Sequence, residues 1–203
     1  MCDYDIEKYL LKKGYRYICG VDEVGRGAIF GPVVSGAVIL NPEKLNFEIK
    51  DSKKLSHNKR LDLAKYIYKN SFAFSIGWCW NEEIDVINIL EATKKSIKMA
   101  VSKLQILPNY VLIDGMKPAF LNIPGEGILR GDNKSLSIAA ASIIAKVFRD
   151  FLLISFSEYF PEYHLKKNKG YPTLNHINAI SSNKITEFHR KSFKIRKCQQ
   201  VRG

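Results

Sequence analysis

Cysteine is scarce in this chain of 203 residues, which has only four. They are far apart, with no C-x-x-C pair and no histidine at metal-ligating spacing: Cys2, Cys19, Cys79 and Cys198. A zinc site is therefore not expected, and a reducing cytosol is the default compartment. We expect Cys19 and Cys79 to be buried apolar residues.

Long hydrophobic runs are also missing. The most apolar region, 136–156, is interrupted by Lys146, Arg149 and Asp150, so it does not predict a membrane span. The N-terminus lacks the basic and then apolar order of a signal peptide, and it carries no myristoylation glycine. We therefore expect a cytoplasmic protein that does not bind a membrane.

Acidic residues are outnumbered by basic ones. Thirty-two Lys and Arg against 20 Asp and Glu leave a formal net charge of +12. A folded domain this basic most often binds a polyanion, either nucleic acid or an anionic membrane surface. The alternative is a lysine-rich proteome that selects for no charged partner. With 46% hydrophobic and 26% charged residues, the composition excludes collagen, disordered tails and low-complexity scaffolds.

The hydrophobic pattern predicts strands separated by helices. The expected strands lie at 17–21, 33–40, 72–80 and 110–113, and the expected helices at 56–69, 82–106, 135–160 and 173–184. The first two strands flank a glycine-rich turn, which predicts a hairpin. Small residues at 139–142 indicate that the long helix packs closely against another backbone. A basic loop is expected at 164–169. This order predicts an α/β or α+β class with a mixed sheet.

Acidic side chains stand where the predicted strands end. Asp22 and Glu23 directly follow the first strand, and Asp114 ends another. Asp132 precedes the long helix. Ligand sites in open α/β sheets gather at strand ends, so these four acids could meet. Four carboxylates repel one another unless a hard divalent cation such as Mg²⁺ lies between them. An acidic pocket in a basic protein therefore suggests a two-metal nuclease. Taken singly, each acid is more often a turn or cap residue.

Further motifs have the composition of phosphate or nucleotide contacts. Glycines in the turn at 25–27 let a backbone approach an anion, although such a motif alone is usually a hairpin turn. The Asp-Ser-Lys-Lys motif at 51–54 precedes a predicted helix start, where a phosphate could bind or the helix could simply be capped. Tyr171 follows a basic run and could pack on a sugar or base, with a buried tyrosine as the alternative. His176 and His189 form no nucleophile triad and are expected to be structural or to lie at the substrate edge.

In their order along the chain, these motifs resemble the ribonuclease HII family, the type 2 RNases H. The resemblance runs from about residue 17 to residue 195. Its blocks are Gly-Val-Asp-Glu-Val-Gly-Arg-Gly at 20–27, Gly-Pro-Val-Val at 31–34, Asp-Ser-Lys-Lys-Leu-Ser at 51–56, Ile-Asp-Gly at 113–115, Gly-Asp at 131–132, Ile-Ala-Ala-Ala-Ser-Ile-Ile-Ala-Lys-Val at 138–147, Lys-Gly-Tyr at 169–171 and His-Arg-Lys-Ser-Phe at 189–193.

The resemblance implies an RNase H-like α/β fold, with a mixed central β-sheet flanked by helices and a helical C-terminal part. The expected organisation is a lead-in at 1–16, a catalytic core at 17–160 and a substrate-binding part of the same domain at 161–203. The implied activity is endonucleolytic hydrolysis of RNA in RNA/DNA hybrids, and cutting 5′ to single ribonucleotides in duplex DNA. Two Mg²⁺ or Mn²⁺ ions would serve this reaction, which leaves a 3′-OH and a 5′-phosphate. Ribonucleotide removal in DNA repair and replication would be its role.

The resemblance also implies roles for individual residues. The family's metal-binding and catalytic acids match Asp22, Glu23, Asp114 and Asp132. The loop that recognises the ribonucleotide 2′-OH, the group that distinguishes RNA from DNA, matches Gly25, Arg26 and Gly27. Tyr171 matches the tyrosine that packs on the sugar of the next deoxynucleotide. The expected phosphate contacts are Ser52, Lys53, Lys54, Lys146 and Arg149.

Some positions depart from the family's usual pattern. Ala28-Ile29-Phe30 stands where Pro-Leu-Ala is common, Met116 where Asn is frequent and Pro172 where Gly is frequent. These changes could alter loop rigidity near the 2′-OH-reading loop. The chain shows no aromatic pair of a sliding-clamp motif at its C-terminus, and only 16 residues precede the first predicted strand, unlike in the type 3 family. We expect a monomer without a clamp tether.

Three other functions are compatible with parts of this pattern. A junction resolvase or a transposase-like nuclease could use the same fold, because fold does not determine function. A nucleic-acid-binding module without activity would also be basic, although all four acids argue against it. A generic basic protein is the third alternative, which the ordered motifs disfavour.

Overall fold

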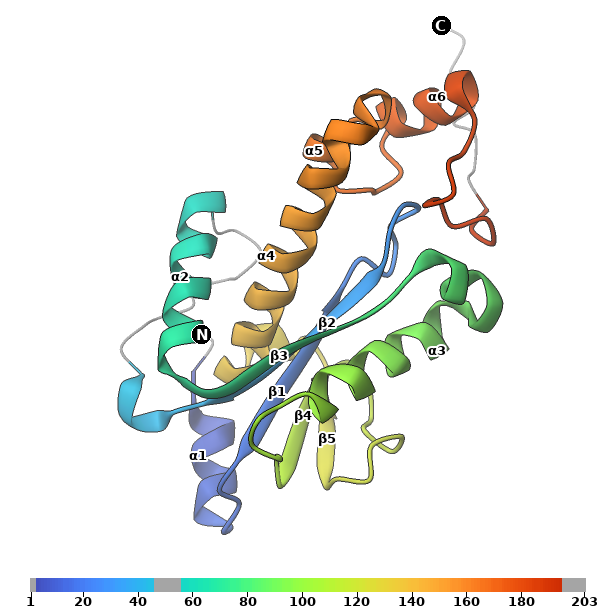
Figure 1. Ribbon diagram of the computed structural model, residues 1–203. Coiled ribbons are helices and arrows are strands. Elements are labelled where there is room, and N and C mark those ends of the chain that lie inside the picture. Colours follow the sequence, from blue (N-terminus) through green and yellow to red (C-terminus); the bar gives the residue numbers. More distant parts are fainter. Residues whose placement is uncertain (1–2, 46–55, 195–203) are drawn as a thin grey trace, which may run out of the picture.

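The structure is a computed structural model that describes residues 3–45 and 56–194. Five strands form one sheet in the order β3-β2-β1-β4-β5, and helices lie on both of its faces (Figure 1). The strands are β1 (Ile18–Val24), β2 (Val33–Leu40), β3 (Ser71–Cys79), β4 (Tyr110–Asp114) and β5 (Gly125–Ile128). The helices are α1 (Asp5–Lys12), α2 (His57–Asn70), α3 (Asn81–Ser102), α4 (Leu136–Tyr159), α5 (Leu165–Asn168) and α6 (Leu174–Asn183).

The sheet is mixed, as the sequence predicted. β1 and β2 form the expected antiparallel hairpin, and β2 pairs antiparallel with β3. β1 pairs with β4 in parallel, and β4 pairs in parallel with β5. Val21 lies opposite Ile113, so the acids that follow them come to the same end of the sheet. The sequence analysis missed β5, whose Gly-Glu-Gly-Ile sequence contains no apolar run.

Glycines allow α4 to lie directly on the sheet. A Cβ atom on Gly20 of β1 would stand 2.0 Å from the backbone carbon of Ser137, and one on Gly36 of β2 would stand 2.4 Å from the carbonyl oxygen of Ala141. The close packing predicted from the small residues of this helix is therefore confirmed. α3 covers the opposite face, where a Cβ atom on Gly77 would stand 2.1 Å from the carbonyl oxygen of Ser96. Figure 1 shows the sheet between these two helices.

Helix α3 differs from its prediction. An unbroken helix was expected over 82–106, but the helix ends at Ser102 and is kinked at Asn88, which has a φ of 67°. With a ψ of 166°, the backbone at Asn88 is not helical, so the hydrogen-bond ladder of the helix is interrupted here. The side-chain oxygen of Asn88 accepts hydrogen bonds from the backbone N–H groups of Leu90 and Glu91, so it caps the second part of the helix. Apolar spacing alone does not reveal such an internal cap.

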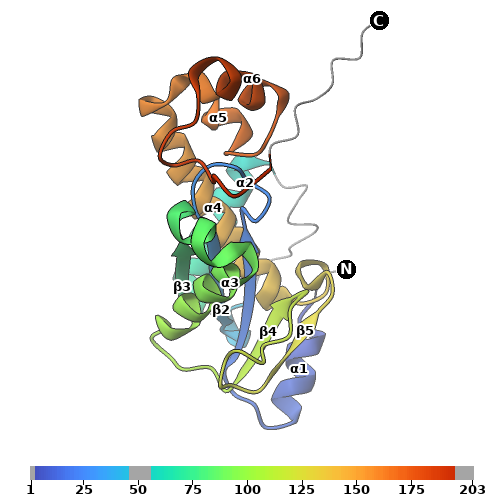
Figure 2. The same cartoon turned by 90° about the vertical axis from the view of Figure 1, so that its right-hand side faces the viewer.

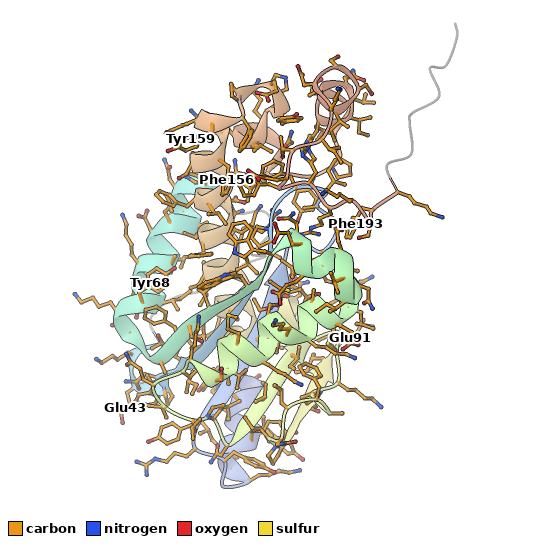
Figure 3. The ribbon with its side chains drawn as sticks, turned by 45° about the vertical axis from the view of Figure 1, so that its right-hand side comes forward. Glu43, Tyr68, Glu91, Phe156, Tyr159 and Phe193 are labelled. Atoms are coloured by element: carbon orange, nitrogen blue, oxygen red, sulfur yellow. The ribbon has the colours of Figure 1, made fainter. Side chains whose placement is uncertain are left out.

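The C-terminal part continues from α4, which extends past the sheet to α5 and α6 (Figures 1 and 2). The basic loop expected at 164–169 contains the short helix α5. Phe30, at the tip of the β1–β2 hairpin, is fully buried here. Its ring packs against the rings of Phe156, Phe160 and Phe188, and Figure 3 shows Phe156 projecting from α4. The unusual Phe30 thus anchors the hairpin tip to the C-terminal part.

The remaining helices confirm the predicted caps. Ser56 and Thr173 accept hydrogen bonds from backbone N–H groups at the starts of α2 and α6. Cys19 and Cys79 are free and buried, as predicted. Across the part of the chain that the structure describes, no helix has the length and apolarity needed to cross a membrane.

Candidate active site

A cavity of about 420 Å³ opens at the carboxyl ends of β1 and β4. Three carboxylates lie on its wall together with a glycine-rich loop, three basic side chains and one tyrosine. Its lining includes Asp22, Glu23, Asp114, Gly25, Arg26, Gly27, Arg60, Ser142, Lys146 and Tyr171. The cavity therefore brings most of the site residues predicted from the sequence to one place.

Asp22 and Glu23 reach the same cavity because they stand near the end of β1. Asp22 is only 7% exposed, and its Oδ1 accepts a hydrogen bond of 2.7 Å from the backbone N–H of Glu23. Burial raises the pKa of Asp22 well above its usual range, and repulsion by the Glu23 and Asp114 carboxylates raises it further. Burial also raises the pKa of Glu23, and the positive charge of Arg26 partly offsets this rise. The buried position of these acids therefore opposes the simultaneous ionisation of neighbouring carboxyl groups.

Asp114 connects this site to Asp132. Asp114 Oδ1 accepts a hydrogen bond of 2.7 Å from the backbone N–H of Gly131, which precedes Asp132 directly. The Asp132 side chain is buried, and its Oδ1 accepts a hydrogen bond of 3.0 Å from the Asn133 side chain. Asp132 is not among the cavity-lining residues. The structure thus gathers three of the four predicted acids in the cavity and holds the fourth beside them.

The donor atoms fit a hard divalent cation. Glu23 Oε2 is buried without a hydrogen-bond partner, while Oε1 pairs with Arg26 at 3.1 Å. Carboxylate oxygens are the ligands that Mg²⁺ and Mn²⁺ prefer, and a cation would relieve the repulsion that raises these pKa values. Within residues 3–45 and 56–194, no three His, Cys, Asp or Glu side chains are yet arranged to hold a metal ion. The fit therefore rests on the chemistry of the acids, which are Asp22, Glu23 and Asp114.

Gly25 and Gly27 of the hairpin loop have different environments. Gly25 has a φ of +90°, and a Cβ atom there would stand 2.2 Å from Nε of Arg149. The fold itself therefore requires glycine at position 25. A Cβ atom on Gly27 would meet no atom within 4 Å. Arg26 lies between them with its side chain 47% exposed. Gly27 is thus free of packing constraints on the cavity wall.

The sequence analysis missed two polar residues of the cavity wall, Ser142 and Arg60. Ser142 on α4 bonds the Asp22 carboxylate through its side chain, but its stretch of small residues indicated only packing. Arg60 projects into the cavity from the first turn of α2. The one sequence feature that could have indicated Arg60 as a site residue is its place in the helix that follows the Asp-Ser-Lys-Lys motif. Both add polar or positive groups near the acids.

Comparison with known proteins decides the family. A family model described as Ribonuclease HII matches residues 19–196. The ribonuclease HII of Caldicellulosiruptor saccharolyticus is 45% identical over 190 residues, which cover 94% of this chain and 93% of that protein. The chain belongs to the ribonuclease HII family. Its activity is accordingly that of a hydrolase that cleaves RNA endonucleolytically in RNA/DNA hybrids.

Solved structures confirm the RNase H-like fold expected for ribonuclease HII. The RNase HII of Archaeoglobus fulgidus, solved as a complex with PCNA, matches with a TM-score of 0.76 at 24% identity over 91% of this chain and 98% of that one. Bst-RNase HIII, solved with Mn²⁺, matches with a TM-score of 0.60 at 18% identity over 83% of this chain and 70% of that one. The motifs that resembled ribonuclease HII thus lie on the corresponding fold.

The structure places the predicted phosphate contacts in different environments. Lys146 lines the cavity, where its Nζ donates a hydrogen bond of 2.6 Å to Asp150 Oδ1. Arg149 was expected to contact a phosphate, but it is not among the residues that line the cavity. Its side chain is buried, and its guanidinium donates to three backbone carbonyls. That prediction is corrected here, because a side chain with this burial and these partners does not face a phosphate. Ser52, Lys53 and Lys54 lie outside the described residues.

His176 and His189 do not line the cavity and are structural. Both are buried, and burial lowers the pKa of His189 to about 4. The backbone N–H of Thr186 donates to His189 Nδ1, so the His189 proton resides on Nε2, 3.2 Å from His176 Nε2. His176 is then left with a proton on Nδ1, 3.0 Å from the carbonyl oxygen of Tyr171. The neutral pair therefore supports the turn that carries Tyr171.

Proposed function

We propose that this enzyme, besides cleaving RNA/DNA hybrids, cuts duplex DNA on the 5′ side of a single embedded ribonucleotide and leaves a 3′-OH and a 5′-phosphate. One observation carries the proposal: a single cavity is lined by three carboxylates and also by the Gly25–Gly27 loop and Tyr171. A scissile phosphate and the sugars beside it would meet both groups at once. This activity would serve ribonucleotide removal in DNA repair and replication.

Two divalent ions, Mg²⁺ or Mn²⁺, would be held by Asp22, Glu23 and Asp114, with Asp132 beside them. When bound, such ions activate a water for attack on phosphorus and stabilise the leaving oxygen. The Mn²⁺ complex of Bst-RNase HIII, a protein of the same fold, supports a divalent cofactor. The role of the protein is to keep these acids together on one wall of the cavity.

The chain's own basic and hydroxyl groups would orient the substrate and the acids. Arg26 pairs with Glu23, and Ser142 bonds Asp22, so both carboxylates are held from the protein side. Lys146 and Arg60 add positive charge to the cavity wall, where it would attract the phosphate backbone. The Gly25–Gly27 backbone would approach the 2′-OH, the group that separates RNA from DNA. Tyr171 would pack on the sugar of the following deoxynucleotide.

The chemistry of the cut can be tested by the ends of the products. Attack by water on the 5′ side of the ribonucleotide predicts a 5′-phosphate and a 3′-OH in the two fragments. Attack by the substrate's own 2′-OH would instead leave a 2′,3′-cyclic phosphate on the other side of the ribonucleotide. Mass spectrometry of fragments from a duplex with one ribonucleotide distinguishes the two, and a cyclic product would contradict the proposal.

Tyr171→Ala is expected to lower kcat/KM about tenfold on a duplex with one ribonucleotide, because loss of a stacking contact costs about 1–3 kcal/mol. A long RNA/DNA hybrid should lose less, since every one of its positions offers a ribose and many registers can be cut. Tyr159→Ala is the matched control, because that tyrosine is 79% exposed and points away from α4 in Figure 3. Steady-state cleavage of both substrates measures the effect. An equal loss on both would indicate a purely structural tyrosine.

Gly27→Ala is expected to lower cleavage at a single ribonucleotide while leaving the melting temperature unchanged. The added methyl meets no protein atom within 4 Å, so the fold has room for it. A ribose close to the loop would meet that methyl, and we expect a loss of roughly tenfold in kcat/KM, as is typical for a lost hydrogen bond to substrate. Cleavage rates and thermal melts of the variant test this. Unchanged cleavage would mean that the substrate does not approach Gly27.

A further inference from the structure

We propose that Arg149 is a positioning residue that sets how efficiently the enzyme cuts at a single ribonucleotide relative to a long RNA/DNA hybrid. Its buried guanidinium would hold the Gly25–Gly27 loop and the turn of Tyr171 at a fixed separation. This inference rests on the proposed function, in which these two elements read the ribose and the next sugar. It assigns the specificity of the site to a residue that the substrate does not touch.

The hydrogen bonds of Arg149 connect two segments far apart in the sequence. Its Nε and Nη2 each donate a bond of 3.0 Å to the hairpin segment, at the carbonyl oxygens of Pro32 and Phe30. Its Nη1 donates a bond of 2.7 Å to the carbonyl oxygen of Lys169, two residues before Tyr171. The side chain is 0% exposed. One rigid group therefore fixes both segments.

The same side chain also packs against the two reading elements directly. Arg149 Nε lies where a Cβ atom of Gly25 would be, at 2.2 Å, so the glycine and the guanidinium are in close contact. Arg149 Cζ lies 5.6 Å from the centre of the Tyr171 ring, within the range of a cation–π contact. The guanidinium thus stands between the loop and the tyrosine as a spacer.

Arginine suits this position for a geometric reason. Its planar fork offers five N–H donors in fixed directions, whereas the lysine ammonium is a compact group on a flexible stem. Lysine at 149 would keep the charge but could not reach all three carbonyls with the spacing that arginine imposes. Arg149→Lys therefore loosens the connection between the two segments without removing the buried cation.

Arg190 provides a matched comparison. It is also buried, and it also donates to the hairpin loop, with bonds of 3.0 Å from Nε to the Gly31 carbonyl oxygen and from Nη1 to the Arg26 carbonyl oxygen. These hydrogen bonds hold the loop but do not reach the Tyr171 turn. Arg190→Lys should therefore loosen the loop alone.

The test is a double-mutant cycle on the full chain. Arg149→Lys and Arg190→Lys are each made alone and together with Tyr171→Ala, and kcat/KM is measured on a single-ribonucleotide duplex and on a long RNA/DNA hybrid. We expect Arg149→Lys to lower the ratio of kcat/KM on the single-ribonucleotide duplex to kcat/KM on the long hybrid roughly tenfold. In the double variant it should lower this ratio little beyond the effect of Tyr171→Ala, because both substitutions act on the same contact. The effect of Arg190→Lys should add to that of Tyr171→Ala.

Three results would overturn the inference: an equal loss on both substrates, additivity of Arg149→Lys with Tyr171→Ala, or the same coupling for Arg190→Lys. If Arg149→Lys does not fold, Arg149→Gln tests the same connection, because its uncharged amide places no buried cation at the site and offers fewer N–H donors to the three carbonyls. It should show the same non-additivity with Tyr171→Ala. If Tyr171→Ala leaves the ratio of kcat/KM on the two substrates unchanged, the result would instead reject the proposed function.

Discussion

Asp22→Asn is expected to reduce cleavage of RNA/DNA hybrids by roughly a thousandfold or more, because it removes a charged oxygen ligand from the site where a divalent cation would act. Asparagine has nearly the shape of aspartate and can still accept the hydrogen bond from the Glu23 N–H. It cannot supply the negative charge. The fold should survive, because the neutral amide avoids both the burial of a charge and the repulsion by neighbouring carboxylates that raise the pKa of Asp22.

Binding of the hybrid should change little in Asp22→Asn, since affinity for nucleic acid comes mainly from phosphate contacts with basic groups. Single-turnover cleavage with Mn²⁺ and fluorescence anisotropy of a labelled hybrid measure the two quantities. Asp62→Asn is the matched control, because its side chain is 75% exposed on α2. Cleavage by Asp22→Asn at the control's rate would contradict the assignment of the acids.

Gly20→Ala is expected to lower the free energy of unfolding by at least about 3 kcal/mol, which is the upper end of the usual cost of adding a methyl group to a closely packed core. The new Cβ atom would stand 2.0 Å from the backbone carbon of Ser137 and 2.3 Å from the nitrogen of Ile138. Neither side can yield, since Gly20 lies in the sheet between Val38 and Leu112 and the obstacle is helix backbone.

The stability of Gly20→Ala can be measured by urea unfolding, with Gly27→Ala as the control. Gly27 has no atom within 4 Å of its Cβ position, so the same substitution there should leave the midpoint unchanged. The contrast isolates the close contact between β1 and α4 from any general effect of adding a methyl. Equal midpoints for the two variants would mean that α4 does not lie on the sheet at this distance.

Local patterns predicted most of the fold. Each apolar run, the glycine turn and the Ser56 cap consists of residues that are close together in the sequence. The β1–β2 hairpin and helices α2 and α4 could therefore be placed from the sequence. β5 has no apolar run, and it forms because β4 offers an edge to pair with. The kink at Asn88 depends on a cap inside a helix, which hydrophobic spacing does not detect.

The acidic residues of the site could be predicted because they lie at the ends of strands. Asp22, Glu23 and Asp114 end neighbouring parallel strands, so their meeting in one cavity follows from the order of the strands. The position of Arg149 could not be predicted in this way. Two of the three carbonyls that bind Arg149, those of Phe30 and Pro32, lie more than a hundred residues away in the sequence, so no local pattern indicates them.

The most direct test is cleavage of a labelled DNA duplex that carries one ribonucleotide, with Mg²⁺, Mn²⁺ or EDTA, beside an all-DNA duplex of the same sequence. We predict one cut on the 5′ side of the ribonucleotide that requires the metal, and an intact all-DNA duplex. Cleavage in EDTA would contradict the role given to the acids. An uncut single-ribonucleotide duplex beside a cleaved RNA/DNA hybrid would contradict the reading of Gly25–Gly27 and Tyr171.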